Sequence, residues 1–299
     1  HTKLLNVDEF LRAFGDSAYK LGGNKLTEEL FEAGFIEANA MLCPGMGELL
    51  RVLILVTSAP GHFSKRQSIR ETWGTVGQRT DVALGFFLGA SFNESTEYDL
   101  DRESATYGDL IRGNSLDTYE NLTLKSLSML EWTVTYCPMT PYLLKTDDDM
   151  FLNMKALLEF MEDHSEDTER IFGHIAKNWA PHRDLESKWY VPEESFKNAM
   201  FPDFVTGPIY LLTGDILLDL YTTALKTTFL WLEDVFLTGF VAEQLKIPRK
   251  DIGKVIKRID AGDLLPCNLA HFVAIHDVDI TEQFDFWYHL NNPQTLTNC

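Results

Sequence analysis

The feature that most restricts the fold of this chain is a run of apolar residues that ends in three consecutive aspartates. The segment 142–146 is followed by Asp147, Asp148 and Asp149, and apolar residues resume at Met150. A short apolar run of this kind predicts a buried strand that delivers the carboxylates to its C-terminal end. Adjacent carboxylates raise one another's pKa unless a cation neutralises them, and oxygen ligands suit Mn²⁺ or Mg²⁺. The pattern predicts a cation site that holds a nucleotide diphosphate, and a solvated acidic turn is the alternative interpretation.

The bulk composition is that of a folded, acidic protein. The 299 residues are 45% hydrophobic and 24% charged, which is ordinary for a globular chain that buries a large core. The 26 basic and 45 acidic residues give a formal net charge of −19, so the chain would repel a polyphosphate backbone and we expect no nucleic-acid partner. A nucleotide remains compatible, because a divalent cation and a few local basic side chains reverse the sign inside a cleft.

The cysteines and two sequence motifs bear on the cellular compartment. The four cysteines lack the CxxC spacing of a zinc site or a thioredoxin-type pair: they are Cys43, Cys137, Cys267 and Cys299. They allow two disulfides, in any of three pairings. The tripeptides that begin at Asn93 and Asn121 are N-glycosylation motifs, which are compatible with the secretory pathway.

No apolar stretch in the sequence is long enough to span a membrane, which needs about 18 residues or more. The chain starts at His1 and shows no signal-peptide pattern. We therefore expect a lumenal portion whose only membrane link is an N-terminal anchor that lies upstream of these residues.

Two parts of the chain differ in pattern. Residues 1–45 predict an N-terminal stem packed on the main body, with a short amphipathic helix within 4–14 and an acidic helix at about 27–40. From residue 46 to residue 299, short apolar runs alternate with helical patterns, which indicates βαβ units and a mostly parallel sheet in one domain. Strands are predicted at 51–56, 82–88, 109–111, 142–146, 171–176 and 208–212, and helices at 95–106, 118–136, 153–163, 215–225 and 234–244.

Polar residues follow two of the predicted strands. Ligands of open α/β sheets bind at the carboxyl ends of strands, and Thr57 and Ser58 follow the first strong strand as the aspartates follow a later one. We expect these two groups to face each other. Arg66 and Arg70 lie one helical turn apart, where they would reach a pyrophosphate or form ion pairs with surface acids.

Five motifs occur together in a fixed order. They are Arg66-x-x-x-Arg70-x-Thr-Trp-Gly, Tyr-Gly-Asp-Leu-Ile at Tyr107, Tyr-x-Asn-Leu-Thr-Leu-Lys at Tyr119, Lys-Thr-Asp-Asp-Asp-Met-Phe at Lys145 and Glu-Asp-Val-Phe at Glu233. The set resembles the inverting β1,3-glycosyltransferases, over about residues 50–290. The segment 187–191, Ser-Lys-Trp-Tyr-Val, favours the β1,3-galactosyltransferase branch.

This resemblance implies a GT-A type architecture, a Rossmann-like, mostly parallel sheet flanked by helices in a single catalytic domain. It also implies a UDP-sugar donor and Mn²⁺, with Mg²⁺ as the alternative ion. Asp147 and Asp149 would engage the metal and, through it, the diphosphate and ribose, and Asp148 occupies a position where the family tolerates other residues. By this resemblance, His276 would be a further metal ligand. The alternative interpretation of a lone histidine after an apolar run is a histidine packed in the core.

Inversion at a sugar carbon needs a base that deprotonates the acceptor hydroxyl. The family's base is the aspartate of the Glu-Asp-Val motif, which corresponds to Asp234, with Glu233 grouped among the donor-binding residues. The apolar neighbours of Asp234 would raise its pKa and suit it to that role. The alternative role of Asp234 is the N-cap of the helix at 234–244, and both roles are compatible.

Other residues bear on the sugar. Trp189 is predicted to be a donor-binding residue whose ring stacks on a sugar, and packing in the core is the alternative interpretation. Gly207 would let the backbone approach the donor sugar closely. Val205 and Ile275 stand where many galactosyl members have cysteines, which fits the loss of one disulfide and leaves the donor sugar open.

The predicted function is transfer of a sugar, galactose by this interpretation, from UDP to the 3-hydroxyl of an acceptor glycan on a glycoprotein or glycolipid in the Golgi lumen. The same chemistry with UDP-N-acetylglucosamine is one alternative. A metal-dependent phosphohydrolase is another, although its motif normally continues with Thr or Val where this chain has Met150 and Phe151. A catalytically silent glycan-binding module is the third, and the intact Asp147, Asp149 and Asp234 argue against it. The acceptor and the oligomeric state are left open.

Overall fold

The computed structural model describes residues 25–253, 256–258, 266–292 and 294. Its centre is an eight-stranded sheet with the strand order β1-β4-β3-β2-β5-β8-β7-β9. These strands are β1 (Phe35–Glu37), β2 (Val52–Thr57), β3 (Val82–Ala90), β4 (Leu110–Leu116), β5 (Tyr142–Asp147), β7 (Ile171–Ala176), β8 (Phe204–Thr213) and β9 (Arg249–Asp251). The central strands β4, β3, β2 and β5 run parallel, whereas β8 is antiparallel to both β5 and β7. The expected α/β class with a mostly parallel central sheet is confirmed.

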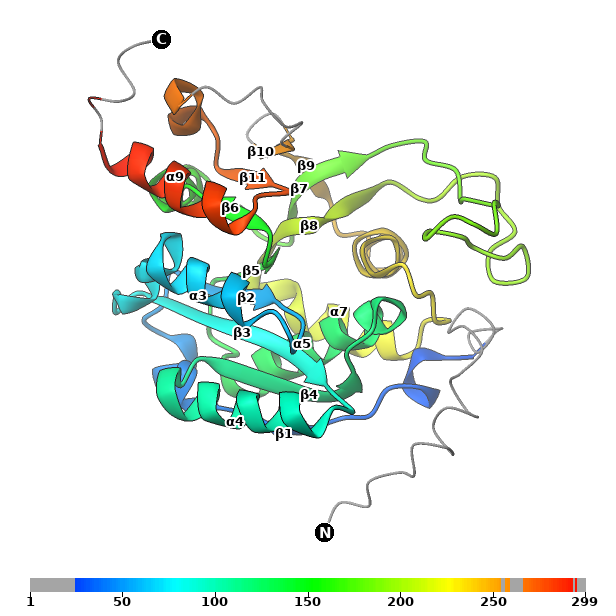
Figure 1. The fold of residues 1–299 in the computed structure, drawn as a ribbon. Helices are drawn as coiled ribbons and strands as arrows, with labels where there is room; N and C mark the ends of the chain where they lie inside the picture. The colour runs from blue at the N-terminus through cyan, green and yellow to red at the C-terminus, as the bar shows by residue number, and fades with distance from the viewer. Residues whose placement is uncertain (1–24, 254–255, 259–265, 293, 295–299) are drawn as a thin grey trace.

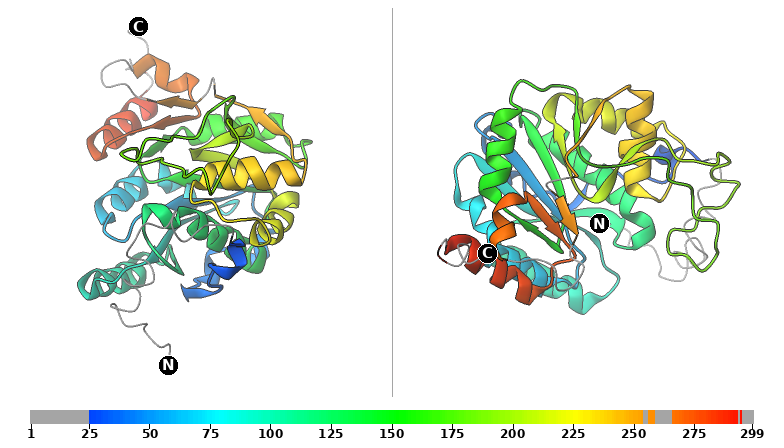
Figure 2. Two further views of the ribbon diagram at one scale, coloured as in Figure 1. Left: turned by 90° about the vertical axis from the view of Figure 1, so that its right-hand side faces the viewer. Right: turned by 90° about the horizontal axis from the view of Figure 1, so that it is seen from above.

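Helices cover both faces of this sheet (Figures 1 and 2). They are α3 (Phe63–Glu71), α4 (Glu94–Tyr107), α5 (Leu122–Tyr136), α6 (Met154–Asp163), α7 (Leu217–Leu225), the π-helix η7 (Val235–Val241) with its continuation α8 (Ala242–Gln244), and α9 (Ile280–Asn291). Short 3₁₀ turns complete the order: η1 (Thr27–Glu29), η2 (Ala40–Leu42), η3 (Pro44–Gly47), η4 (Trp73–Gln78), η5 (Tyr119–Asn121), η6 (Gly214–Ile216) and η8 (Pro266–His271).

Strand β2 shows why both faces must be covered. Its residues alternate between two apolar clusters, with Leu53 and Leu55 in one and Ile54 and Val56 in the other. The first cluster includes side chains of α5, α7 and η7, and the second includes side chains of α3, α6 and α9. A strand that is apolar at every position is typical of a parallel sheet buried on both sides, which explains the unbroken apolar run in the sequence.

A second, three-stranded sheet lies beside the first. In it, β11 (Ala274–His276) pairs parallel to β10 (Ile256–Arg258) and antiparallel to β6 (Met150–Leu152). Because β6 follows the three aspartates directly, this small sheet fixes the position of the chain on the far side of the acidic turn.

The segment before residue 45 differs from its prediction. A helix at 27–40 is wrong: the chain forms η1 and then β1, an edge strand that is antiparallel to β4. Gly34 has a φ of 93°, a left-handed conformation that stops a helix and lets the chain turn into the strand. The helix predicted within 4–14 lies outside the described residues.

A disulfide joins Cys43 to Cys137, the residue that follows α5. It ties the segment before β2 to the main body, and it identifies the partner of Cys43 among the three pairings that the sequence left open. No helix in the described ranges is both long and apolar enough to cross a bilayer.

Candidate active site

The acidic turn lies where β5 ends beside β2. Thr57 is opposite Asp147 in the parallel register, and its hydroxyl donates to Asp147 Oδ1. The hydroxyl of Ser58 donates to Asp148 Oδ2 over 2.7 Å. The two polar groups that follow β2 and β5 therefore face each other, as expected from the carboxyl ends of adjacent parallel strands.

Lys145 is a buried cation at the centre of this region. Its Nζ donates to Asp147 Oδ1 over 2.6 Å and to the carbonyl oxygen of Gly207 over 2.7 Å. Burial lowers the pKa of Lys145, but the charges of Asp147 and Glu233 more than offset this and hold the pKa above its ordinary value. The sequence analysis quoted Lys145 only as part of a motif. The signal that could have identified it is a lysine inside an apolar strand, since lysine is almost never fully buried without a partner.

Asp234 is fixed by two backbone donors. Its Oδ1 accepts from the N–H of Val235 over 2.8 Å, and its Oδ2 accepts from the N–H of Gly207 over 2.9 Å. Burial raises the pKa of Asp234, although these two N–H groups oppose the rise. The N-cap role is confirmed, but the helix that it caps differs from the expected α-helix: η7 is a π-helix, and Arg249 donates to the carbonyl oxygens of Thr238 and Gly239 within it.

Glu233 is a second buried acid beside Asp234. The hydroxyl of Tyr210 donates to Glu233 Oε1 over 2.6 Å. Burial raises the pKa of Glu233 to about 7, and the charge of Lys145 limits the rise. The carboxyl group of Glu233 is therefore paired with the Tyr210 hydroxyl inside the protein, and its protonation state depends on the buried charges around it.

Gly207 connects the two halves of the site. Its carbonyl accepts from Lys145 and its N–H donates to Asp234, so one peptide segment links the acidic turn to the second acidic motif. A Cβ at this position would lie 3.3 Å from Asp234 Oδ2, so a side chain would crowd the carboxylate. The glycine therefore leaves room for this close approach of the backbone.

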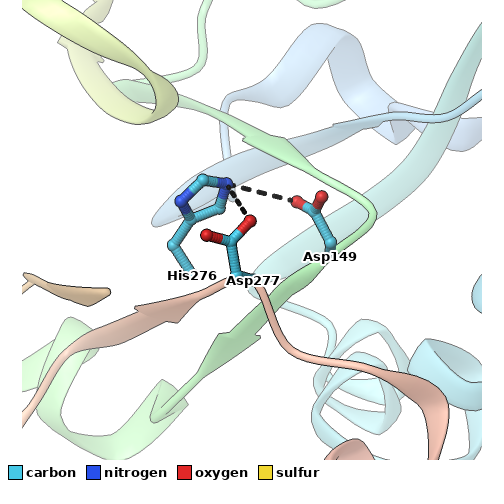
Figure 3. Close-up of side chains that lie close together, drawn as sticks. All are labelled: Asp149, His276 and Asp277. Atoms are coloured by element: carbon cyan, nitrogen blue, oxygen red, sulfur yellow. Dashed lines mark ion pairs between the residues drawn. The ribbon is translucent and has the colours of Figure 1, made fainter. Parts of the chain in front are cut away.

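Asp149, His276 and Asp277 form a group whose ligand atoms all lie within 4.8 Å of one another (Figure 3). His276 Nε2 is 3.7 Å from Asp149 Oδ1 and 3.6 Å from Asp277 Oδ1. The antiparallel register of β6 and β11, which sets His276 opposite Met150, brings them together. Asp277 was missed by the sequence analysis, although an acid directly after a candidate ligand is a usable signal.

The donors of this group fit a divalent cation. Asp149 Oδ1 is buried and has no hydrogen-bond partner, and burial together with the charge of Asp147 raises the pKa of Asp149. An imidazole with carboxylate oxygens is a donor set that suits a divalent metal ion. Asp147 is not one of the three residues of the group, and its Oδ1 accepts from Lys145 and Thr57. A metal-ligand role for Asp147 stays a prediction.

Asp148 is held by Lys65, which lies in α3, and by His62, which directly precedes α3. It accepts from Lys65 Nζ over 3.0 Å, and His62 Nδ1 lies 2.7 Å from its Oδ2. Burial acts to raise the pKa of Asp148, but the hydrogen bond from His62 and the charge of Lys65 bring it below its ordinary value. Asp148 is therefore an ionised carboxylate that ties the turn to Ser58, His62 and Lys65.

Arg66 and Arg70 form ion pairs, which is one of the two roles that the sequence left open, and a pyrophosphate contact stays a prediction. Arg66 is fully buried and makes a two-pronged ion pair with Glu103, at 2.7 and 2.6 Å. Arg70 pairs with Glu103 and Asp109. The ion-pair alternative therefore describes both arginines, with partners that are buried or half-buried rather than on the surface. Their guanidinium groups hold α3 against α4.

Trp189 lies in the irregular segment 177–203 and is half-exposed rather than part of the core. Its Nε1 donates to the hydroxyl oxygen of Tyr119 over 3.0 Å, and the ring of Tyr119 packs edge-on against Trp231 with centroids 5.8 Å apart. Burial raises the pKa of Tyr119, and the negative charges of Asp234 and Asp147 add to the rise. The charges of both acidic motifs therefore act on Tyr119.

Comparison with known proteins gives one consistent result. A family model described as Galactosyltransferase matches residues 64–253. Beta-1,3-galactosyltransferase 5 of Pan paniscus is 31% identical over 246 residues, which cover 81% of this chain and 81% of that protein. Beta-1,3-galactosyltransferase 2 of Mus musculus is also 31% identical over 246 residues, and the matched region spans 80% of this chain but only 58% of that protein.

Solved structures resemble the chain more distantly. A glycosyltransferase involved in the glycosylation of the major capsid of PBCV-1 aligns with a TM-score of 0.41 and 12% identity, over 80% of this chain and 98% of that one. A likeness at this level carries no inference about the site.

Proposed function

The chain belongs to the galactosyltransferase family, and on that premise we propose that it moves galactose from UDP-galactose to the 3-hydroxyl of an acceptor glycan, with inversion at the anomeric carbon. The names of the similar proteins support the sugar and the linkage. The observation that carries the mechanism is the connection from Asp147 through Lys145 and Gly207 to Asp234. It holds a carboxylate of raised pKa at a fixed position beside the acidic turn.

Asp234 is the proposed base. Each of its oxygens accepts one backbone hydrogen bond, and a carboxylate oxygen can accept a second. The two backbone donors prevent rotation of the carboxylate, so the oxygen that meets the acceptor hydroxyl is already oriented. The raised pKa of Asp234 brings its basicity closer to what removal of a hydroxyl proton requires.

The donor diphosphate is proposed to lie at the acidic turn. Asp149, His276 and Asp277 would hold the divalent cation, and the bound ion would neutralise the charge of the departing UDP. Lys145 and Thr57 fix Asp147, while His62 and Lys65 fix Asp148. These contacts keep the like charges of the turn apart.

We further propose that the protein works in the Golgi lumen on glycoprotein or glycolipid acceptors. The disulfide between Cys43 and Cys137 supports an oxidising compartment, because such bonds persist in the secretory pathway and are rare in the cytosol.

A donor screen tests this proposal. Purified protein is incubated with UDP-galactose, UDP-N-acetylglucosamine or UDP-glucose and a panel of methyl β-glycosides, with Mn²⁺ present or chelated, and both UDP and the glycoside products are measured. We expect UDP-galactose to give a disaccharide only when Mn²⁺ is present. Transfer from UDP-N-acetylglucosamine alone would correct the donor. Release of phosphate from simple phosphomonoesters without any sugar transfer would contradict the proposal.

A further inference from the structure

Strand β8 and the helix that follows Asp234 are joined by two hydrogen bonds from the strand. The N–H of Gly207 donates to Asp234 Oδ2 over 2.9 Å, and the N–H of Val205 donates to Thr238 Oγ1 over 2.8 Å. Two residues of a strand extend about 6.6 Å and one turn of a helix rises about 5.4 Å, so both elements place their partners at a similar spacing. The contact of Thr238 with Val205 therefore fixes which residue of β8 lies beside Asp234.

The hydroxyl group of Thr238 is fully buried and reaches both elements at once. Besides accepting from Val205, its Oγ1 lies 2.7 Å from the carbonyl oxygen of Asp234 and 2.9 Å from that of Val205. The single hydroxyl proton can be donated to only one of these two carbonyls at a time. With either partner, the hydroxyl stays bound between β8 and the turn of helix that begins at the proposed base.

Arg249 holds the same turn of η7 through its backbone. Its Nε donates to the carbonyl oxygen of Thr238 over 2.8 Å, and its Nη2 donates to that of Gly239 over 2.7 Å. Arg249 lies in β9, which pairs with β7, and β7 pairs with β8, so this contact ties η7 to the same sheet. A Cβ at Gly239 would lie 3.2 Å from the Cβ of Phe204, which shows how closely η7 packs against the start of β8.

The orientation of the Asp234 carboxylate depends on this alignment. One of its backbone donors, the N–H of Val235, is the next residue of the chain and moves with the helix. The other donor, the N–H of Gly207, belongs to β8 and meets Asp234 only while η7 keeps its place along that strand. A change that lets η7 slide or tilt along β8 would therefore break one of the two contacts and free the carboxylate to rotate.

We propose that Thr238, supported by Arg249, is a positioning residue for the base: its hydroxyl fixes η7 along β8 so that the N–H of Gly207 meets Asp234. This inference rests on the proposed function, which gives Asp234 its role. Thr238 acts through the backbone of β8 and η7. Its loss should therefore misplace the carboxylate and leave the binding of donor and acceptor unchanged.

The test compares two buried threonines. Thr238→Val removes the hydroxyl, and Thr238→Ser keeps it. Thr133→Val is the matched control, because Thr133 is also fully buried and its hydroxyl donates over 2.8 Å to the carbonyl of Met129, four residues earlier in the same helix. Hydrogen exchange of the Gly207 amide, followed by NMR of glycine-labelled protein, reports its contact with Asp234 without turnover. Steady-state kinetics with UDP-galactose and the preferred methyl β-glycoside report kcat and both KM values.

Thr238→Val should speed exchange of the Gly207 amide about tenfold relative to Thr133→Val, the size of effect that loss of a buried hydrogen bond produces. It should also lower kcat about 10- to 100-fold with both KM values unchanged, because the base is misplaced while the substrates still bind. Thr238→Ser should restore the exchange rate and kcat. Equal Gly207 exchange in Thr238→Val and Thr133→Val would overturn the inference, as would a Thr238→Ser protein as impaired as Thr238→Val.

Arg249→Lys provides a second variant if Thr238→Val does not fold. Lysine keeps the positive charge but lacks the planar fork that reaches two carbonyl oxygens, so the same amide should exchange faster, by a smaller factor. Unchanged exchange in Arg249→Lys would overturn the inference. Wild-type protein that transfers no sugar while the variants change the exchange rate as expected would support the positioning of Asp234 and count against the proposed function alone.

Discussion

Replacing Lys145 with methionine tests whether this one cation holds the two acidic motifs together. Methionine has a similar length and no charge, so the change removes the contacts to Asp147 and Gly207 with little change in volume. Removing one partner of a buried ion pair costs about 3–5 kcal/mol. Asp147 is 36% exposed and can regain water, so we expect the lower end of that range, about 3 kcal/mol of unfolding free energy.

The measurement is urea unfolding at pH 8, followed by tryptophan fluorescence. Lys155→Met is the matched control, because Lys155 is 86% exposed and pairs with Glu159 at 3.9 Å, an interaction worth at most about 1 kcal/mol. Adding Glu233→Gln to Lys145→Met should restore about 1 kcal/mol or more, since the glutamine carries no buried charge that needs the lysine. A Lys145→Met protein as stable as the Lys155→Met control would refute this explanation.

Three further predictions concern the acids. Asp234→Asn should lower kcat about 10²- to 10⁴-fold while Mn²⁺-dependent UDP binding, measured by calorimetry, is kept; normal turnover would exclude Asp234 as the base. Asp149→Ala should weaken Mn²⁺ binding, measured by electron paramagnetic resonance, and an unchanged affinity would remove Asp149 from the metal group. Burial raises the pKa of Glu233 from 4.5 to about 7, so between these pH values the folded state keeps a proton that the unfolded chain releases. The free energy of unfolding should therefore fall by on the order of 3 kcal/mol as the pH rises from about 4.5 to about 7. Glu233→Gln should flatten this pH dependence in unfolding experiments, and an unchanged slope would contradict the raised pKa.

The sequence predicted the parts of the site that local patterns encode. The apolar run before Asp147 predicted a buried strand, and the run that precedes Thr57 had the same character, so their carboxyl ends were expected to meet. The pairing of Thr57 with Asp147 confirms this. The N-cap role of Asp234 was predictable for the same reason, since capping depends on neighbouring residues.

Contacts that depend on the identity of one distant partner were not predictable. Arg66 is buried because the two carboxylate oxygens of Glu103, on a different helix, accept two hydrogen bonds from its guanidinium group. No local sequence pattern predicts that partner. The exchange of an expected helix at 27–40 for the edge strand β1 likewise depends on pairing with β4. Tertiary contacts of this kind override local propensity.

The site near the small sheet shows the same limit. His276 was expected as a ligand from the resemblance alone, whereas the approach of His276 and Asp277 to Asp149 depends on the register between β6 and β11. Lys145 was visible in the sequence, but its contact with Gly207 depends on the antiparallel pairing of β5 and β8.

The anomeric configuration of the product is the most direct test of the central claim, that Asp234 deprotonates an acceptor on one side while UDP leaves on the other. Wild-type protein is supplied with UDP-galactose, in which galactose is α-linked, Mn²⁺ and the preferred methyl β-glycoside, and the disaccharide is examined by proton NMR. A single displacement predicts a β-linked galactose on the 3-position of the acceptor. An α-linked product would contradict the mechanism, because it would require retention at the anomeric carbon.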